Sequence, residues 1–495
     1  MIKKIILIGS FLSFQFSHSL LGQEMLGTSL GNYSGINSIK LNPSAMHNSK
    51  TYLDIQFLGA DVFFENNFLY QDKEDYKFSH FFESGYQWPT HKESYGTEER
   101  AFYRYDNNNL KNVYSSIRLD GPGAMLIWND HAFGITTSVR NVISAHNLPY
   151  ELANFIYLGL NYRSQHNINY RDSRPFSIAE MGWAELGLSY SYRFYTRGFT
   201  MLSAGISVRR LFGVAGTYMY SNQLDYIVIN DSTLSIKNLN AEYGVALPIS
   251  YKTSEFDLDK LFKGGGFGFD IGITYQRLKQ YHTSNSYPSF CAPRYEDYLY
   301  RIGISLIDIG AVQFKTNARK YVINDRSSYW DNLTSFTFSD VDQLMDTISY
   351  KFYGNDTAAF AGGKFMIWLP SAISVQFDYH LKEHWYINAS LIYGFNLGRA
   401  SLSRPAELSI TPRYENRWFE ASLPISLYDW YLPRIGLAFR FYGFTIGTDK
   451  LGGFFNLNNF TGLDFYFSIK LFFNKGSCKT DQRTPCGNLE FNPQD

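Results

Sequence analysis

Two groups of residues have the chemical types that acid–base catalysis uses, but both fall at predicted turns. Asp130 stands next to His131, and His380 and His384 flank a short stretch. A carboxylate beside an imidazole can move protons when both line a cleft, whereas at a tight turn the same groups are solvated. The chain also has no Walker A, H-E-x-x-H, G-x-S-x-G or CxxC motif. We therefore expect no enzyme, although a site assembled from distant loops would leave no local motif.

A glycine run that could suggest a cofactor site has the wrong surroundings. Gly264-Gly265-Gly266 opens a predicted strand, whereas a phosphate-binding glycine loop opens a helix. No cofactor and no metal site is expected. Lys and Arg number 45 and so do Asp and Glu, so the charge balance gives no attraction to nucleic acid.

Other charged residues alternate with apolar ones along strand-length runs. The residues with odd numbers from Leu463 to Phe473 are all apolar, and those between them include Asp464, Ser468 and Lys470. Runs at 184–194 and 267–276 repeat this pattern. Because successive side chains of a strand point to opposite faces, the polar residues would line a lumen. The lumen candidates are Glu185, Arg193, Asp270, Arg434, Arg440, Asp464 and Lys470, with Arg209, Gln276 and Glu420 beside them. Such a polar lumen can also be held together simply by ion pairs.

Strand length distinguishes a transmembrane barrel from a soluble β-sandwich. The alternating runs are about ten residues long, as a tilted membrane strand requires, and sandwich strands are usually shorter. Aromatic residues make up 18% of the chain, yet the mean hydropathy is −0.25, so ring surface is interleaved with polar residues. Trp183, Trp385, Trp418 and Trp430 lie near predicted strand ends, as in an interfacial girdle. The expected fold is all-β, a transmembrane antiparallel β-barrel of about 14 strands, within a range of 12–16.

The spacing of the strands predicts the topology. Strands are expected to begin near Thr51, Asn112, His131, Gly182, Phe199, Gly266, Tyr298, Ser371, His384, Ser403, Arg417, Tyr431, Phe444 and Gly462. The second strand would kink at Gly121-Pro122-Gly123, because proline cannot donate to the ladder. Turns after even-numbered strands are mostly short, and long loops lie on the other side, as in outer-membrane barrels. The segment 278–297 is an exception to the short turns.

The N-terminus has the layout of a secretory signal peptide. Lys3 and Lys4 precede a mostly apolar run over residues 5–16, which is too short for a membrane helix. Cleavage after Ser19 or after Gly22 fits equally. The expected organisation is a signal peptide (1–22), an N-terminal hatch or plug segment (23–50), an outer-membrane β-barrel (51–473) and a periplasmic tail (474–495). The expected location is the outer membrane of a bacterial cell, with outer-membrane lipid as a partner.

Three cysteines fit an oxidising compartment. Cys478 and Cys486 lie in the polar tail, where a disulfide between them is plausible. Cys291 could pair with either cysteine or remain a thiol, and the sequence does not decide the connectivity.

Several short motifs resemble an outer-membrane family of the Bacteroidota. They are Gly27-Thr28-Ser29-Leu30-Gly31, Asn42-Pro43-Ser44-Ala45, Gly121-Pro122-Gly123, residues 301–308, Ile446-Gly447-Thr448-Asp449 and Thr461-Gly462-Leu463-Asp464, with late cysteines. That family is described only as domain of unknown function 5723. The resemblance covers nearly the whole mature chain and implies a barrel without implying any chemistry.

A more distant resemblance is to FadL-type barrels, whose N-terminal hatch carries Asn-Pro-Ala. Asn42 and Pro43 match, but Ser44 stands in the place of that alanine, so the pair could equally be a turn before the first strand. The resemblance implies passage or binding of small hydrophobic molecules, and in the PorV branch handling of secretion cargo. The expected function is therefore a conduit or binder for small hydrophobic molecules. The alternative is a non-transporting structural or secretion-associated barrel that docks a protein partner.

Overall fold

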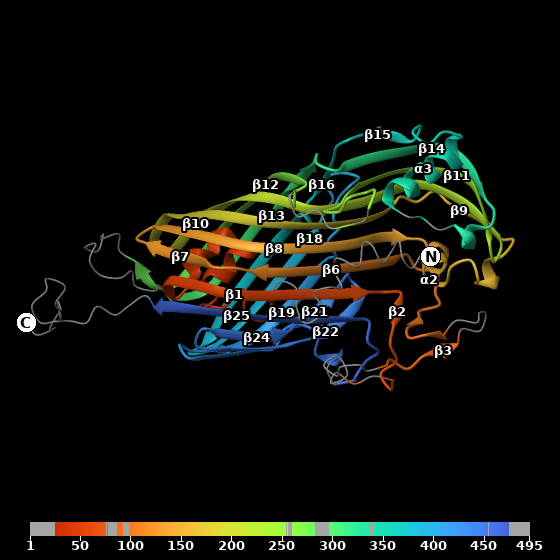
Figure 1. The fold of residues 1–495 in the computed structure, drawn as a ribbon. Coiled ribbons are helices and arrows are strands. Elements are labelled where there is room, and N and C mark those ends of the chain that lie inside the picture. The colour runs from red at the N-terminus through yellow and green to blue at the C-terminus, as the bar shows by residue number, and fades with distance from the viewer. Residues whose placement is uncertain are drawn as a thin grey trace, which may run out of the picture.

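The strands close into one antiparallel barrel, because the first strand pairs with the last. The computed structural model describes residues 25–75, 77, 87–92, 99–253, 255, 260–282, 297–336, 338, 340–453 and 455–474. β1 (Thr51–Asn66) pairs on one side with β25 (Gly462–Asn474) and on the other with β6 (Lys111–Asp120) and β7 (Gly123–Trp128). The barrel has 13 strands, which lie side by side between two very different ends (Figure 1). The predicted fold class is confirmed.

The remaining wall strands follow each other in chain order around the barrel. They are β8 (His131–Leu148), β10 (Phe176–Asn230), β12 (Gly264–His282), β13 (Tyr298–Phe314), β16 (Phe365–Trp368), β17 (Ala372–Lys382), β18 (Trp385–Gly394), β19 (Glu407–Glu415), β20 (Phe419–Ser422), β21 (Ile425–Tyr428), β22 (Leu432–Ile435), β23 (Leu437–Phe441) and β24 (Phe444–Thr448). Four passes through the wall are each interrupted once, as β6/β7, β16/β17, β20/β21 and β22/β23.

The long strand β10 passes through the wall twice. Residues 177–192 pair with β8 and residues 198–213 pair with β12. The Ser189 and Ser207 hydroxyls lie 2.7 Å apart, so the two limbs run next to each other. Counting the limbs separately gives one pass more than the 13 strands, in agreement with the predicted count.

The predicted alternation gives the wall its inside and its outside. On β25 the side chains of Asp464, Tyr466, Ser468 and Lys470 are buried, while Ile469, Leu471 and Phe473 are exposed. An exposed apolar band around a closed barrel is the surface that contacts lipid chains in membrane barrels. None of the helices in the described part of the chain is long and apolar enough to cross a membrane.

Two irregularities break the ladder and reorient side chains. β6 ends at Asp120 and β7 begins at Gly123, so the predicted kink at Pro122 is present. On β13 the register against β12 shifts between Leu306 and Ile309. Asp308 has φ +57° at this bulge, a conformation that Asp adopts more easily than most residues. The bulge leaves the Asp308 carboxylate buried.

The two ends of the barrel differ as predicted. Several turns at one end are only two or three residues long, as between Trp128 and His131 or between Phe441 and Phe444. The other end carries the small strands, the helices and the extended part of β10, at the right of Figure 1. These elements are β2 (Leu69–Tyr70), β3 (His91–Lys92), β4 (Glu99–Arg100), β5 (Tyr103–Arg104), α2 (Tyr150–Leu158), η4 (Arg163–Gln165), β9 (Asn169–Asp172), β11 (Thr233–Ala246), β14 (Ala318–Trp330), η5 (Leu333–Ser335), α3 (Val341–Tyr353), β15 (Phe360–Gly362) and η6 (Leu451–Gly453). We call the end of the barrel that carries these elements the loop end, and the opposite end the short-turn end.

A lobe at the loop end is built on an extension of the wall. The outer part of β10 pairs with β11, and β11 pairs with β14. The helix α3 packs on this sheet through Ile348 and Phe352. It begins at Asp340, whose carboxylate accepts the Gln343 N–H at 2.8 Å, and ends at Gly354 in the left-handed conformation, a common pair of helix caps.

The lumen is filled in layers. Residues 25–50 contain η1 (Gly35–Lys40) and η2 (Pro43–Asn48), and they lie inside the barrel toward the short-turn end, drawn red in Figure 1. An apolar cluster that includes Phe63, Trp183 and Phe314 is buried toward the loop end.

The placement of Trp183 in an interfacial girdle was wrong, because its ring is fully buried and faces the lumen. Trp385, Trp418 and Trp430 are exposed.

Candidate functional site

The segment 25–50, which we call the hatch, is held in a socket made by glycines of the wall. Asn42 caps η2: its side-chain oxygen accepts the Ser44 N–H at 3.0 Å, and its amide donates to Gln376 Oε1 at 2.9 Å. Three consecutive wall passes carry Gly205, Gly272 and Gly303 where the hatch comes closest. A Cβ atom on Gly205 would lie 2.5 Å from Ser44 N, and one on Gly272 would overlap the Asn42 side chain. The socket therefore requires glycine for close approach rather than for backbone conformation.

Charged groups of the wall tie down the first half of the hatch. Lys470 donates to the carbonyl oxygens of Tyr33 and Ser34, both at 2.7 Å, and pairs with Asp54 at 2.8 Å. All of these groups are buried, so an ion pair with one partner removed would leave an uncompensated charge, at a cost of about 3–5 kcal/mol. The wall and the hatch are thus stabilised together.

Two more contacts hold the beginning of the hatch. The Leu26 N–H donates to Asp449 at 3.1 Å, and the Asp449 N–H donates to Asp464 at 2.8 Å. The Asn32 N–H donates to the buried Glu415 at 3.0 Å. Hatch residues therefore contact wall passes on several sides of the lumen.

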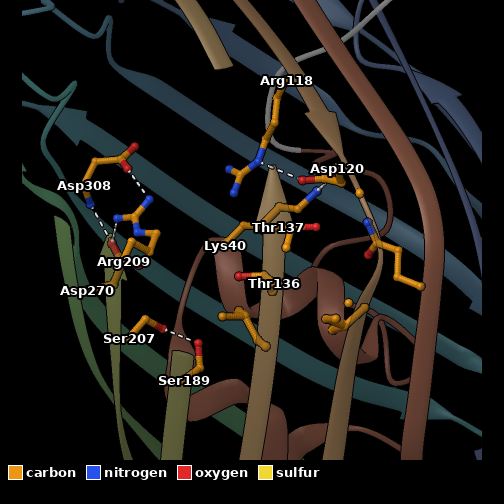
Figure 2. Close-up of a pocket in the computed structure, with 15 residues that line it drawn as sticks. Lys40, Arg118, Asp120, Thr136, Thr137, Ser189, Ser207, Arg209, Asp270 and Asp308 are labelled. Carbon is orange, nitrogen blue, oxygen red and sulfur yellow. Dashed lines mark hydrogen bonds and ion pairs between the residues drawn. The ribbon is translucent and has the colours of Figure 1, made fainter. Parts of the chain in front are cut away.

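A chain of ion pairs runs from the hatch into the middle of the lumen. Hatch residue Lys40 pairs with Asp120 at 2.5 Å, and Asp120 pairs with Arg118 at 3.0 Å, beside the break in the wall (Figure 2). Arg118 also lies 3.3 Å from Glu185, and Glu185 lies 3.6 Å from Arg209. This series of ion pairs links the hatch to strands that are far from it in sequence.

The chain ends in a buried cluster around Asp308. Arg209 pairs with Asp270 at 2.5 Å and with Asp308 at 2.7 Å, as Figure 2 shows. Arg140 donates two hydrogen bonds to the Asp308 carboxylate at 2.8 and 3.0 Å. Arg404, from the inward loop between β18 and β19, lies 3.9 Å from the same carboxylate. Five cations thus face four carboxylates in this network, counting Lys40 and Arg118 with the arginines.

A small cavity lies between the hatch and this network. It is lined by Ile36, Ile39 and Lys40 of the hatch and by Thr136 and Arg209 of the wall, among others, and its volume is about 30 Å³. That volume holds roughly one or two water molecules.

The predicted lumen residues fall into different surroundings. Glu185 and Asp270 belong to the central network, whereas Asp464 and Lys470 contact the hatch or its partners. Arg440 pairs with Glu420 at 2.9 Å and lies over the ring of hatch residue Tyr33, with its guanidinium 4.5 Å from the ring centroid.

Two of the predicted residues stand apart from the hatch contacts. Arg434 pairs with Glu407 and lies against the rings of Phe63 and Tyr428. Arg193 pairs with Asp130 at 2.7 Å at the short-turn rim, where its side chain is partly exposed. Cys478 and Cys486 lie outside the described residues.

Sequence reasoning missed the centre of the network. Asp308 belongs to a motif that was noticed, but the bulge at this residue breaks the alternation that identifies inward positions. Arg140 lies in regular alternation on β8 and could have been found by extending the pattern to that strand. Lys40 gave no signal, because the hatch has no strand periodicity.

Toward the loop end from the network, apolar side chains line the lumen. Phe63 of β1, Trp183 of β10, Phe314 of β13, Leu402 of the inward loop and Tyr428 of β21 belong to one buried cluster. The guanidinium of Arg140 lies over the Trp183 ring, 4.8 Å from its centroid, so the polar and apolar layers meet there. We call this cluster the apolar layer.

The arrangement buries charged groups in pairs and offers no metal site among the described residues. No group of His, Cys, Asp and Glu residues within the described ranges could hold a metal ion. The buried carboxylates are instead neutralised by arginine and lysine. Removing one partner of such a buried ion pair destabilises the fold, because the other charge is left uncompensated.

Comparison with known proteins gives the family of the chain. A model described as "Family of unknown function (DUF5723)" matches residues 43–449. The chain belongs to this family. The matched part begins at Pro43, in the hatch, and includes most of the wall and all of the central network except Lys40. A search of curated protein sequences gave no match.

Solved structures of several barrels are similar in general outline. The toluene transporter TbuX of Ralstonia pickettii has 9% identity and a TM-score of 0.39, with 89% of this chain and 95% of that chain covered. A FadL homologue of Pseudomonas aeruginosa has 11% identity and a TM-score of 0.39, with 92% and 97% covered. A mutant of the monoaromatic hydrocarbon channel TodX has 10% identity and a TM-score of 0.38, with 89% and 95% covered.

Proposed function

We propose that this member of the family is an outer-membrane barrel that takes up or binds small hydrophobic molecules. The observation that supports this most directly is the apolar layer. A water-filled pore has a polar lumen, whereas Phe63, Trp183, Phe314 and Leu402 present apolar surface to the interior from different parts of the barrel. A hydrophobic molecule entering from the loop end would exchange contacts with water for contacts with these side chains, which is favourable.

The hatch is proposed as the gate of this path. It lies inside the lumen toward the short-turn end, and the cavity between it and the central network has a volume of about 30 Å³. Passage therefore requires the hatch to move or to leave its socket. The contacts that would break include the ion pair of Lys40, the hydrogen bond that Asp54 accepts from the hatch and those that Lys470 donates to it.

A variant without residues 23–41 tests this proposal. We expect a folded barrel that takes up a small aromatic hydrocarbon faster than the full chain does, while uptake of a hydrophilic sugar stays low because the apolar layer remains. A second substitution, Leu402→Asp, should reduce hydrocarbon uptake in the shortened chain, since it places a charge on the path. The assay measures both solutes in vesicles containing the purified protein, after gel mobility has verified folding.

The alternative function is a non-transporting barrel that docks a protein partner. It is favoured by the lobe at the loop end, which extends beyond the wall and is covered by α3. Unchanged hydrocarbon uptake in a correctly folded shortened chain would contradict the conduit and leave this alternative. Equal passage of sugar and hydrocarbon would contradict selection by the apolar layer.

A further inference from the structure

An arginine on the outer surface of the wall has no acidic partner among the described residues. Arg210 follows Ile206 and Val208 on the outward face of β10 and is exposed like them. Its guanidinium lies over the ring of Phe267, 4.9 Å from the centroid, and over Phe212 at 5.5 Å. One of its nitrogens donates to the Gly266 carbonyl at 3.0 Å. The side chain is thus fixed against the wall, with its charge uncompensated.

The register of the sheet gives the depth of this arginine. Arg210 pairs with Phe267 on β12, and Arg277 lies at the other end of the outward apolar run of that strand. The ten residue steps from Phe267 to Arg277 span about 33 Å along the strand. With a tilt of about 40°, this corresponds to about 25 Å across the membrane, which is the height of the apolar band of such barrels. Arg210 and Arg277 therefore lie at opposite edges of the band, Arg210 at the loop end.

Two lysines lie on neighbouring strands, four residues further toward the loop end than the partners of Arg210 in the sheet register. Phe314 pairs with Phe365, so Lys315 and Lys364, the residues directly beyond this pair, leave β13 and β16 at the same level. Both lysines are exposed. Phe314 also pairs with Gly264, which pairs with Gly213 on the limb of β10 that carries Arg210. We call Arg210, Lys315 and Lys364 the loop-end basic rim.

We propose that the loop-end basic rim binds the phosphate groups of an anionic lipid in the leaflet that surrounds the loop end. The proposal rests on the membrane location given above. Arginine suits phosphate because its planar guanidinium offers several donors at once, and the rings of Phe267 and Phe212 leave it few other orientations. The two lysines add positive charge on the neighbouring strands, four residues further toward the loop end, and clustered cations favour anionic headgroups. A lipid with two phosphates would contact more than one member of the rim.

The test compares lipid binding by two arginine variants of the full chain. The purified protein in neutral detergent is titrated with a bisphosphorylated glycolipid, and bound lipid is counted by native mass spectrometry. Arg210→Gln should weaken binding about tenfold, the effect of losing one charge-assisted contact. Arg277→Gln is the matched control, because it removes a half-buried, ring-stacked arginine at the other edge, and it should change binding less than twofold.

Further measurements separate the remaining outcomes. The double variant Lys315→Gln/Lys364→Gln should also weaken binding, and an uncharged lipid of the same chain length should bind equally to all variants. Equal binding of the glycolipid to the original protein and to Arg210→Gln would overturn the proposal, as would its displacement by inorganic phosphate at the same concentration. If the variants keep the gel mobility of a folded barrel and fractionate with the outer membrane, such a failure concerns the lipid site and not the membrane location.

Discussion

At the scale of single residues, the polarity of the wall could be deduced, but the partners of the polar groups could not. Glu185 and Asp270 stand at alternating positions, so their inward direction follows from the period of a strand. Their pairing with Arg209 depends on which strands are neighbours and in what register. Asp308 was missed because its bulge inserts an extra residue, and such a shift has no clear signal in one sequence.

The pair of Lys470 and Asp54 gives a prediction at this scale. Lys470→Met should lower the free energy of unfolding by about 3–5 kcal/mol, because Asp54 would remain buried without a counter-charge. The hatch carbonyls of Tyr33 and Ser34 would lose their donor as well. The loss is measured as a lower denaturation midpoint of the folded band on a gel.

The double variant Asp54→Asn/Lys470→Met is the control for this prediction. It removes both charges, so it should be more stable than Lys470→Met alone. If the two variants unfold at the same midpoint, the pair does not stabilise the protein through its charge.

At the scale of elements, most strand starts were predicted closely, whereas the hatch was set apart only by its lack of strand alternation and its Asn42-Pro43 pair. β1, β8, β13, β24 and β25 begin at the expected residues, because alternation and turn residues mark strand ends directly. The hatch consists of short 3-10 turns, whose shape comes from the socket around them. Glycines of the socket such as Gly272 were read as ordinary members of the polar face. The conformation of the hatch therefore depends on contacts between elements that are distant in sequence, and a single sequence does not reveal such contacts.

The socket makes a second prediction. Gly272→Val should release the hatch, because the new side chain would occupy the place of Asn42. The barrel itself should still fold, since valine is favoured in strands. A cysteine placed at Ser44 should then become accessible to a water-soluble thiol reagent, whereas in the parent it is buried.

Gly182→Val provides the matched control for the socket. Gly182 is also a strand glycine, but the atom nearest to an added Cβ there is the Asn141 amide nitrogen at 3.4 Å, an ordinary contact. This variant should leave the Ser44 cysteine protected. Protection in both variants would mean that the glycine socket does not hold the hatch.

At the scale of the whole molecule, the closed barrel explains how an apolar outside coexists with a charged interior. Exposed side chains such as Ile271, Ile469 and Phe473 would be unfavourable in water, and a contiguous band of them indicates a membrane surface. The interior charges are acceptable because they are paired. The sequence indicated both the apolar outside and the charged interior, because the two kinds of side chain alternate with a period of two along each strand. The layering of hatch, ion pairs and apolar groups depends on closure of the whole barrel, which no local pattern reports.

The last prediction tests the membrane location through one outward residue. The full chain should fractionate with the outer membrane and migrate faster on a gel unheated than boiled. Phe467→Lys should reduce the amount of this folded form, because a cation near the middle of the lipid band costs roughly 2–4 kcal/mol. Phe467→Leu keeps the surface apolar and should behave like the parent. The inward neighbour Ser468 is not a neutral control, because hatch residue Asn37 donates to its hydroxyl at 3.2 Å and a lysine there would disturb the hatch. Equal assembly of Phe467→Lys and Phe467→Leu, or recovery of the protein from the periplasmic fraction, would contradict a lipid-facing wall.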